Sequence, residues 1–248
     1  MKPPEAPELN EQPLISHLVE LRNRLLKCVL AVLLVFLGLA PFANDVYSFV
    51  AGPLLVHLPE NTSMIAIDVA SPFLIPFKLA MVAAIFSAMP VLLYQFWAFV
   101  APGLYSREKK FILPLLFAST LLFYCGVIFA YFVVLPLVFE FLTAVAPQGV
   151  AVMTDISKYL DFILTLFFAF GVAFEVPIVT IVLVGTGLVS HAQLAEYRPY
   201  IIVAAFVIGM FLTPPDVISQ TLLAVPIWFL FELGMLFSRP FAQRQNEN

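Results

Sequence analysis

The sequence is poor in charge and in cysteine. Asp, Glu, Lys and Arg make up only 11% of its 248 residues, and the net charge of −4 says little because the placement of the basic residues matters more. The two cysteines, Cys28 and Cys125, both fall in apolar stretches, so we expect packed thiols and neither a disulfide nor a metal pair. So little charge, in a chain that is 62% hydrophobic, excludes an ordinary soluble domain.

The sequence also lacks the common motifs of catalysis and nucleotide binding. It contains no Walker loop, no H-E-x-x-H, no G-x-G-D and no serine–histidine pair with a plausible placement. An intramembrane hydrolase is therefore disfavoured, because both a nucleophile and a base are missing. We expect a protein that is not an enzyme, with no cofactor, no bound metal and no nucleic acid partner.

Apolar residues are what the sequence has in excess, and its mean hydropathy is +1.01. About 20 apolar residues in a helix cross the hydrocarbon core of a bilayer. No small-residue cleavage site follows the first apolar stretch, so we expect that helix to be retained. The sequence predicts an all-α integral membrane protein with six transmembrane helices, approximately residues 25–43, 79–100, 112–135, 159–184, 199–212 and 217–237. They would form one domain, residues 14–238, between a disordered, proline-rich tail (1–13) and a cytoplasmic tail (239–248).

The basic residues predict how the helices are oriented. Lys and Arg gather before the first span, between the second and third, between the fourth and fifth, and after the sixth. Because such residues mark the cytoplasmic side, both termini are expected to be cytoplasmic. The two exceptions, Lys78 and Lys158, lie at the opposite ends of their spans, where a long side chain can extend toward the interface.

Glu175 lies deep in the fourth span, in the segment "FAFGVAFEVPIV". An unpaired carboxylate against lipid is costly, so this side chain should face a cavity, a partner or water. Pro177 removes the hydrogen bond to Ala173 and should kink the helix beside it. Two interpretations remain open: a structural glutamate that holds neighbouring helices together, and a functional site. A proton-coupled solute transporter is one form of the second, although we find no convincing interrupted span in another half of the chain.

The fifth span is short, and the turn after it is tight. Residues 199–212 make roughly 21 Å of helix, less than a typical hydrocarbon core. The following "LTPPD" cannot remain helical, so Asp216 can cap the sixth helix. Gln220 lies one turn deeper on the same face. It is either a satisfied amide in a capped hairpin or part of a polar docking site for another membrane helix.

Two segments carry charge next to the spans on the predicted cytoplasmic side. Residues 14–25 repeat leucine at helical spacing and place Glu20 on the opposite, polar face, which predicts an amphipathic interfacial helix. Residues 95–110, "QFWAFVAPGLYSREKK", combine an aromatic belt, a turn and a charged loop in which Glu108 can simply be solvated. Glu232 is close enough to Arg239 to reach the same interface.

Together these segments resemble a known family. "SHLVELRNRLL" (16–26), "QFWAFVAPGLYSREKK" (95–110), "AYFVVLPL" (130–137), "FGVAFEVP" (170–177) and "GMFLTPPDVISQTLLAVP" (209–226) are similar, in this order, to TatC, the core subunit of the bacterial twin-arginine protein translocase. The resemblance implies six helices in a concave bundle, in the bacterial cytoplasmic membrane. It also implies export of folded proteins driven by the proton-motive force, without a cofactor.

The resemblance further implies a role for particular residues. Glu20 and Glu108 would bind the arginine pair of a signal peptide, and Arg22 and Phe99 belong to the same surface. Glu175 would meet a more deeply inserted signal peptide or partner helix, and its protonation could make insertion sensitive to the proton-motive force. The implied partners are folded cargo with twin-arginine signals, single-span proteins of the TatA and TatB types, and further copies of the chain. The single-span proteins would dock at Met210, Thr213 and Gln220, whereas Pro53, Tyr131 and Asp216 would be structural or capping residues.

Overall fold

The structure, a computed structural model, describes residues 12–57, 65–104, 112–144, 155–212 and 217–246, and these are almost entirely helical. The helices are α1 (Gln12–Leu39), η1 (Ala40–Phe42), α2 (Ala43–His57), α3 (Ser71–Ser87), α4 (Met89–Leu104), α5 (Ile112–Phe129), η3 (Ala130–Val134), α6 (Leu135–Ala144), α7 (Ile156–Ala173), α8 (Val176–Gly185), α9 (His191–Glu196), α10 (Arg198–Leu212) and α11 (Val217–Asn246). The predicted all-α fold is confirmed.

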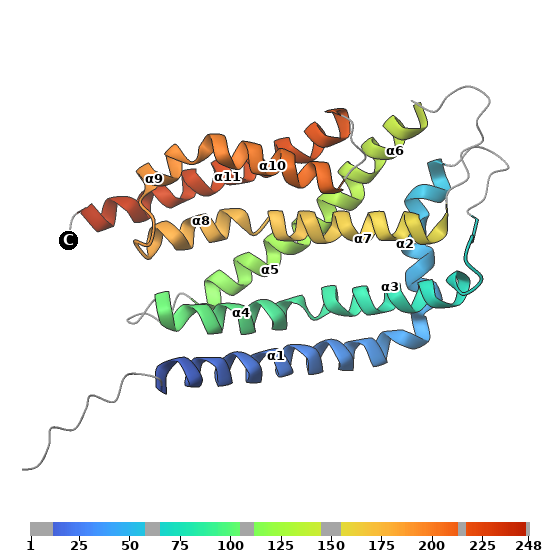
Figure 1. The fold of residues 1–248 in the computed structure, drawn as a ribbon, viewed down its shortest axis with the longest axis horizontal. Coiled ribbons are helices and arrows are strands. Elements are labelled where there is room, and N and C mark those ends of the chain that lie inside the picture. The colour runs from blue at the N-terminus through green and yellow to red at the C-terminus, as the bar shows by residue number, and fades with distance from the viewer. Residues whose placement is uncertain (1–11, 58–64, 105–111, 145–154, 213–216, 247–248) are drawn as a thin grey trace, which may run out of the picture.

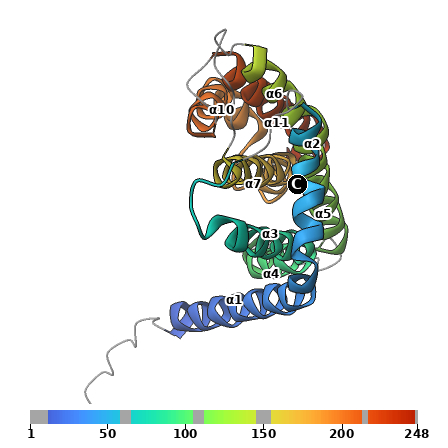
Figure 2. The same ribbon diagram turned by 90° about the vertical axis from the view of Figure 1, so that its right-hand side faces the viewer.

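The long helices lie side by side and follow an arc. Figure 1 shows α1, the α3–α4 pair, the α7–α8 pair and the α10–α11 pair in succession, with α5 crossing behind them. In Figure 2, α1 and α10 lie at the two ends of the arc and α2 and α5 lie along its convex side. The first turn of α1 and the last turn of α11 lie at the same end of the molecule (Figure 1), and we call this end the α1/α11 end.

The predicted spans correspond to helical segments, with differences in length and continuity. Among the described residues, four helical stretches are long and apolar enough to cross a membrane, and the bent α3–α4 pair makes a fifth. The remaining predicted span is the shorter apolar helix Arg198–Phe211, as its sequence indicated. The amphipathic segment leads into the first span without a break, since α1 runs from Gln12 to Leu39.

The second predicted span, 79–100, is not one helix. Helices α3 and α4 meet at Ala88 with a bend of 50°. Pro90 follows directly, and a proline in the first turn of a helix starts a new helix more readily than it continues an old one. The bend gives the protein a second interrupted span, which the sequence analysis did not find.

The fourth predicted span is interrupted at Glu175, as Pro177 predicted. Helix α7 ends at Ala173 and α8 begins at Val176, with the N–H of Glu175 bonded to the carbonyl of Val172 at 3.0 Å. Proline cannot donate to the carbonyl four residues before it, so the regular ladder stops here. The break places the only non-helical residues of this span around the carboxylate.

The core lies between α3, η3, α6 and α7, and the helices approach closely at glycines. Leu79, Leu135, Ile163 and Phe170 are among its buried residues. A Cβ on Gly126 of α5 would lie 2.5 Å from the carbonyl oxygen of Phe170 in α7, a distance that atoms do not tolerate. In contrast, no residue of α1 from Ile15 onward is buried, so this helix presents a wide apolar surface to lipid.

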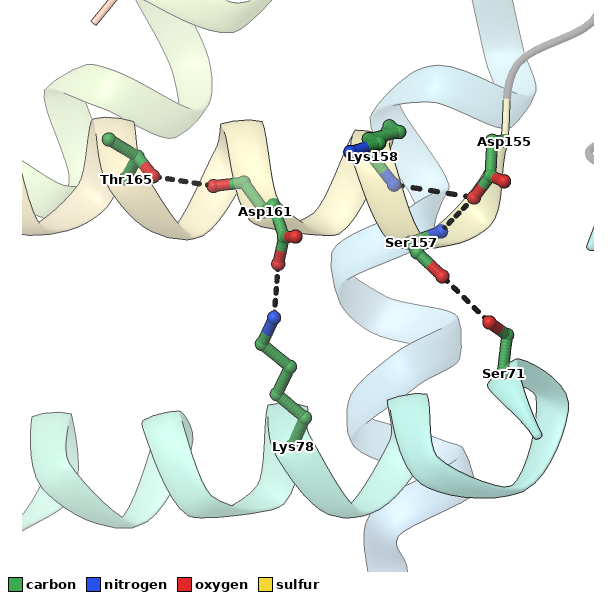
Figure 3. Close-up of polar contacts among 7 residues, drawn as sticks. All are labelled: Ser71, Lys78, Asp155, Ser157, Lys158, Asp161 and Thr165. Carbon is green, nitrogen blue, oxygen red and sulfur yellow. Dashed lines mark hydrogen bonds and ion pairs between the residues drawn. The ribbon is translucent and has the colours of Figure 1, made fainter. Parts of the chain in front are cut away.

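Polar contacts join α3 to α7 away from the α1/α11 end. Figure 3 shows Lys78 of α3 paired with Asp161 of α7, and the Ser71 hydroxyl lies 2.8 Å from that of Ser157. Asp155 caps α7 by accepting the backbone N–H of Ser157 at 2.6 Å.

We expect the Lys78–Asp161 pair to couple the two helices weakly. The side chains are 54% and 50% exposed, and ion pairs of this exposure contribute about 0.2–1 kcal/mol in water. A double-mutant cycle of Lys78→Ala and Asp161→Ala, measured by unfolding in detergent, should give a coupling in this range. Lys27→Ala, which removes a lysine from α1, is the control and should show no coupling with Asp161→Ala. Fully additive effects of the first pair would show that the two charges do not interact.

Candidate functional site

Residues of α1 and α4 form a polar and aromatic cluster near the α1/α11 end. We call it the α1–α4 cluster, and it contains His17, Glu20 and Arg24 of α1 with Gln95 and Phe99 of α4. The imidazole of His17 stacks on the ring of Phe99 with centroids 4.3 Å apart and an interplanar angle of 20°. Glu20 and Phe99, predicted from the resemblance to share a surface, are therefore parts of one connected cluster.

Arg24 holds the carboxylate of Glu20. Its Nε and Nη2 donate to Oε1 of Glu20 at 2.9 and 2.6 Å, and its Nη1 donates to Oε1 of the buried Gln95 at 3.2 Å. The second oxygen, Oε2, lies 3.9 Å from Nδ1 of His17. Arg22 instead donates to the side chain of its neighbour Asn23. The spacing of Glu20 and Arg24, one helical turn apart, was a signal in the sequence that we did not use.

Several predicted residues lie outside what the structure describes. Glu108 belongs to residues 105–111, and Thr213 and Asp216 belong to residues 213–216. Pro53 lies in α2, but its side chain is not among those described. The predicted binding of an arginine pair by Glu20 together with Glu108, and the predicted cap by Asp216, therefore remain predictions.

Glu175 ends a chain of hydrogen bonds that crosses three helices. Nε1 of Trp97 in α4 donates to Oγ of Ser119 in α5 at 3.0 Å, and this hydroxyl donates to Oε2 of Glu175. Trp97 and Ser119 are buried. The other carboxyl oxygen, Oε1, is buried and has no hydrogen-bond partner among the described residues. These hydrogen bonds connect the break between α7 and α8 to α4 and α5, which matches the structural interpretation of Glu175. They leave its Oε1 without a donor among the described residues.

Gln220 has a partner within the chain. Its Nε2 donates to the carbonyl of Phe206 in α10 at 2.8 Å, and the side chain packs on Gly209, where a Cβ would lie 3.2 Å from Cγ of Gln220. This bond is the one that the satisfied amide, one of the two predicted alternatives, requires of the side-chain nitrogen, and docking of a partner helix stays a prediction. Met210, predicted to share the docking site, is 50% exposed on α10.

Two further polar contacts join one helix to another. The hydroxyl of Tyr131 donates to the carbonyl of Phe49 at 3.2 Å, and the two rings stack with centroids 5.6 Å apart, which joins η3 to α2. Glu232 pairs with Arg198 at the start of α10, with oxygen–nitrogen distances of 2.8 and 2.9 Å, and this pairing was not predicted.

Cys28 is half-buried and Cys125 is exposed, so the expected packing of both thiols is wrong for Cys125.

Comparison with known proteins identifies relatives along almost the whole chain. The family described as "Sec-independent protein translocase protein (TatC)" matches residues 16–226. The protein of that name from Haemophilus influenzae is 60% identical over 237 residues, covering 96% of this chain and 93% of its own. The one from Escherichia coli K12 is 56% identical over 228 residues, covering 92% and 88%. A crystal structure described as the twin arginine translocase receptor TatC is 40% identical, covers 91% of this chain and 99% of its own, and superposes with a TM-score of 0.81.

The fold defines the class as a multi-pass helical membrane protein. The comparisons narrow this further, and the chain belongs to the TatC family. It is a component of the Sec-independent protein translocase in the bacterial inner membrane, as the resemblance predicted. The family, and not the number of interrupted spans, decides against a solute transporter, since α3–α4 and α7–α8 are both interrupted.

Proposed function

We propose that this chain is the signal-peptide receptor of the translocase and binds a pair of adjacent arginines at the α1–α4 cluster. The observation that carries the proposal is the carboxylate of Glu20 next to the aromatic ring of Phe99, brought together from two helices through Arg24 and His17. The related crystal structure, described as a twin arginine translocase receptor, supports the same function.

The chemistry of the cluster suits arginine. A guanidinium presents planar N–H donors that match a carboxylate, and its flat face can stack on an aromatic ring. A lysine ammonium can do neither to the same extent. Glu20 and Glu108 would each take one arginine, Phe99 would supply the stacking surface, and Arg22 would add to the charge balance of the surface.

Glu175 would act after this first contact. A carboxyl group within a membrane span that leaves one oxygen without a partner among the described residues can accept a donor from an inserting segment. Binding or release of a proton there would link insertion to the proton-motive force. In this proposal both termini are cytoplasmic, so the α1/α11 end faces the cytoplasm, where the signal peptide arrives.

The partners would be single-span proteins of the TatA and TatB types, together with further copies of the chain and folded cargo. We propose that the single-span proteins dock along α10 and α11 at Met210, Thr213 and Gln220. The exposed side chain of Met210 supports this, as does the short α10, because a short span favours association with other helices. Gln220 would act from the position that its bond to Phe206 gives it.

A peptide-binding experiment tests the receptor function. We expect the purified protein to bind a synthetic signal peptide with Arg-Arg at least about tenfold more tightly than one with Lys-Lys, a difference of about 1.4 kcal/mol. Glu20→Ala and Glu108→Ala should each remove most of this preference, because a carboxylate that receives a guanidinium is lost. The readout is peptide affinity in detergent or nanodiscs, with thermal unfolding as the control for folding.

Two results would contradict the proposal. If folded wild-type protein, with its single-span partner present, binds the two peptides equally well, recognition of arginine does not occur on this chain. If the preference exists but survives in both variants, it lies at another surface.

A further inference from the structure

The carboxylate proposed to receive the signal is already occupied by a guanidinium of the same chain. All three nitrogens of Arg24 are engaged, two with Oε1 of Glu20 and one with Gln95. The Arg24 side chain is 22% exposed and that of Glu20 is 39% exposed, so the pair lies partly within the protein. Only Oε2 of Glu20 remains for other groups, and Nδ1 of His17 lies 3.9 Å from it.

This arrangement is incompatible with a bidentate contact between Glu20 and a second arginine. A guanidinium that forms two parallel N–H···O bonds uses both carboxylate oxygens. Oε1 already accepts two bonds from Arg24. An incoming arginine must therefore displace Arg24 from Oε1, or bind through Oε2 alone and lose one of its two bonds.

We propose that Arg24 is an internal competitor that occupies Glu20 in the resting receptor and sets the specificity for arginine. The inference rests on the proposed function, since it assumes that Glu20 receives an arginine of the signal. When the signal binds, its guanidinium replaces that of Arg24 on Oε1. Arg24 keeps its bond to Gln95 through Nη1, which limits how far it moves.

The exchange favours arginine over lysine for a physical reason. Replacing one guanidinium by another on the same carboxylate forms as many charge-assisted hydrogen bonds as it breaks. Replacing a guanidinium by an ammonium loses the planar pair of donors and gains only a point charge. A bare carboxylate would attract either cation, whereas a carboxylate that is already paired with arginine discriminates between them.

Variants of Arg24 test the inference through the direction of the change. In Arg24→Gln the competitor is gone, so the Arg-Arg peptide should bind about two- to fivefold more tightly, the factor expected for losing a competing ion pair of this exposure. The Lys-Lys peptide should gain more, so the preference between the peptides shrinks. Arg24→Lys retains the charge without the fork and should fall between wild type and Arg24→Gln.

Lys27→Gln is the matched control, because it removes one positive charge from the same helix without touching Glu20. It should shift both affinities by a similar factor and leave the preference unchanged. The inference is overturned if the Arg-Arg peptide binds more weakly to both Arg24 variants than to wild type, because Arg24 would then position the carboxylate and not compete for it. Failure of both variants to fold, seen by thermal unfolding, would likewise make Arg24 a structural residue and overturn it.

Glu20→Ala, measured in the same series, separates this inference from the proposed function. If Glu20→Ala keeps the full preference for Arg-Arg, the proposed site itself is wrong. If Glu20→Ala loses the preference and the Arg24 variants bind more weakly, the receptor site stands and only the role of Arg24 as a competitor fails.

Discussion

Replacing Glu175 by leucine is expected to abolish most export while lowering the stability of the protein only moderately. The carboxyl group accepts one bond from Ser119, and its other oxygen is buried without a partner among the described residues. Leucine removes a half-satisfied carboxyl group from the interior but leaves the buried hydroxyl of Ser119 without this acceptor, at a cost of about 1–3 kcal/mol. If the group has a function, export should fall about tenfold or more, which corresponds to about 1.4 kcal/mol or more.

The measurement pairs thermal unfolding in detergent with export of a twin-arginine reporter in cells. Glu175→Gln is the matched variant, because it keeps the shape and an acceptor for Ser119 but cannot carry a negative charge. Loss of export in both variants, with both proteins folded and present at the wild-type amount, would mean that the ionisable group itself is required. A large drop in the unfolding temperature of Glu175→Leu, with export reduced only as far as the protein is lost, would leave the purely structural interpretation.

A single methyl group added at Gly126 is expected to destabilise the fold strongly. The Cβ of Gly126→Ala would lie 2.5 Å from the carbonyl oxygen and 2.9 Å from the carbonyl carbon of Phe170. These are backbone atoms, so a side-chain rotation cannot relieve the clash and α5 must move away from α7. Overpacking of this kind costs about 1–3 kcal/mol and occasionally more. Thermal unfolding should show a clear decrease in the midpoint.

Gly38→Ala provides the opposite expectation within the same chain. No atom lies within 4 Å of a Cβ built on Gly38 in α1. Alanine is a better helix former than glycine by about 1 kcal/mol, so this variant should be unchanged or more stable. Equal destabilisation by the two substitutions would show that the contact between α5 and α7 is not as close as described.

Local signals in the sequence predicted the helices well, except where two such signals disagreed. Pro177 marked the break beside Glu175, and a run of apolar residues marked each span. Pro90 was an equally local signal, yet we predicted an unbroken helix over 79–100 because the apolar run continues through it. An apolar run indicates that a segment lies in an apolar environment. It does not indicate whether the segment bends.

The contacts within one helical turn could have been predicted, and those between helices could not. Glu20 and Arg24 are four residues apart on one helix, so their ion pair is readable from spacing alone. The bond from Arg24 to Gln95 joins residues 71 positions apart, and the bond from Ser119 to Glu175 joins residues 56 apart. Nothing in the spacing of such residues indicates which helix lies next to which.

The sequence by itself determined that this protein crosses a membrane, where its helices lie and which family it belongs to. These properties depend on the length and order of apolar and polar segments, because each spanning helix must be long enough to cross the hydrocarbon core and must satisfy its own backbone hydrogen bonds. Only the tertiary structure decided that Arg24 also bonds to Gln95, that Glu175 is held by Ser119 and that Gln220 bonds to α10. Those outcomes depend on how the helices pack along the arc, because a polar side chain in a membrane takes its partner from whichever neighbouring helix offers one.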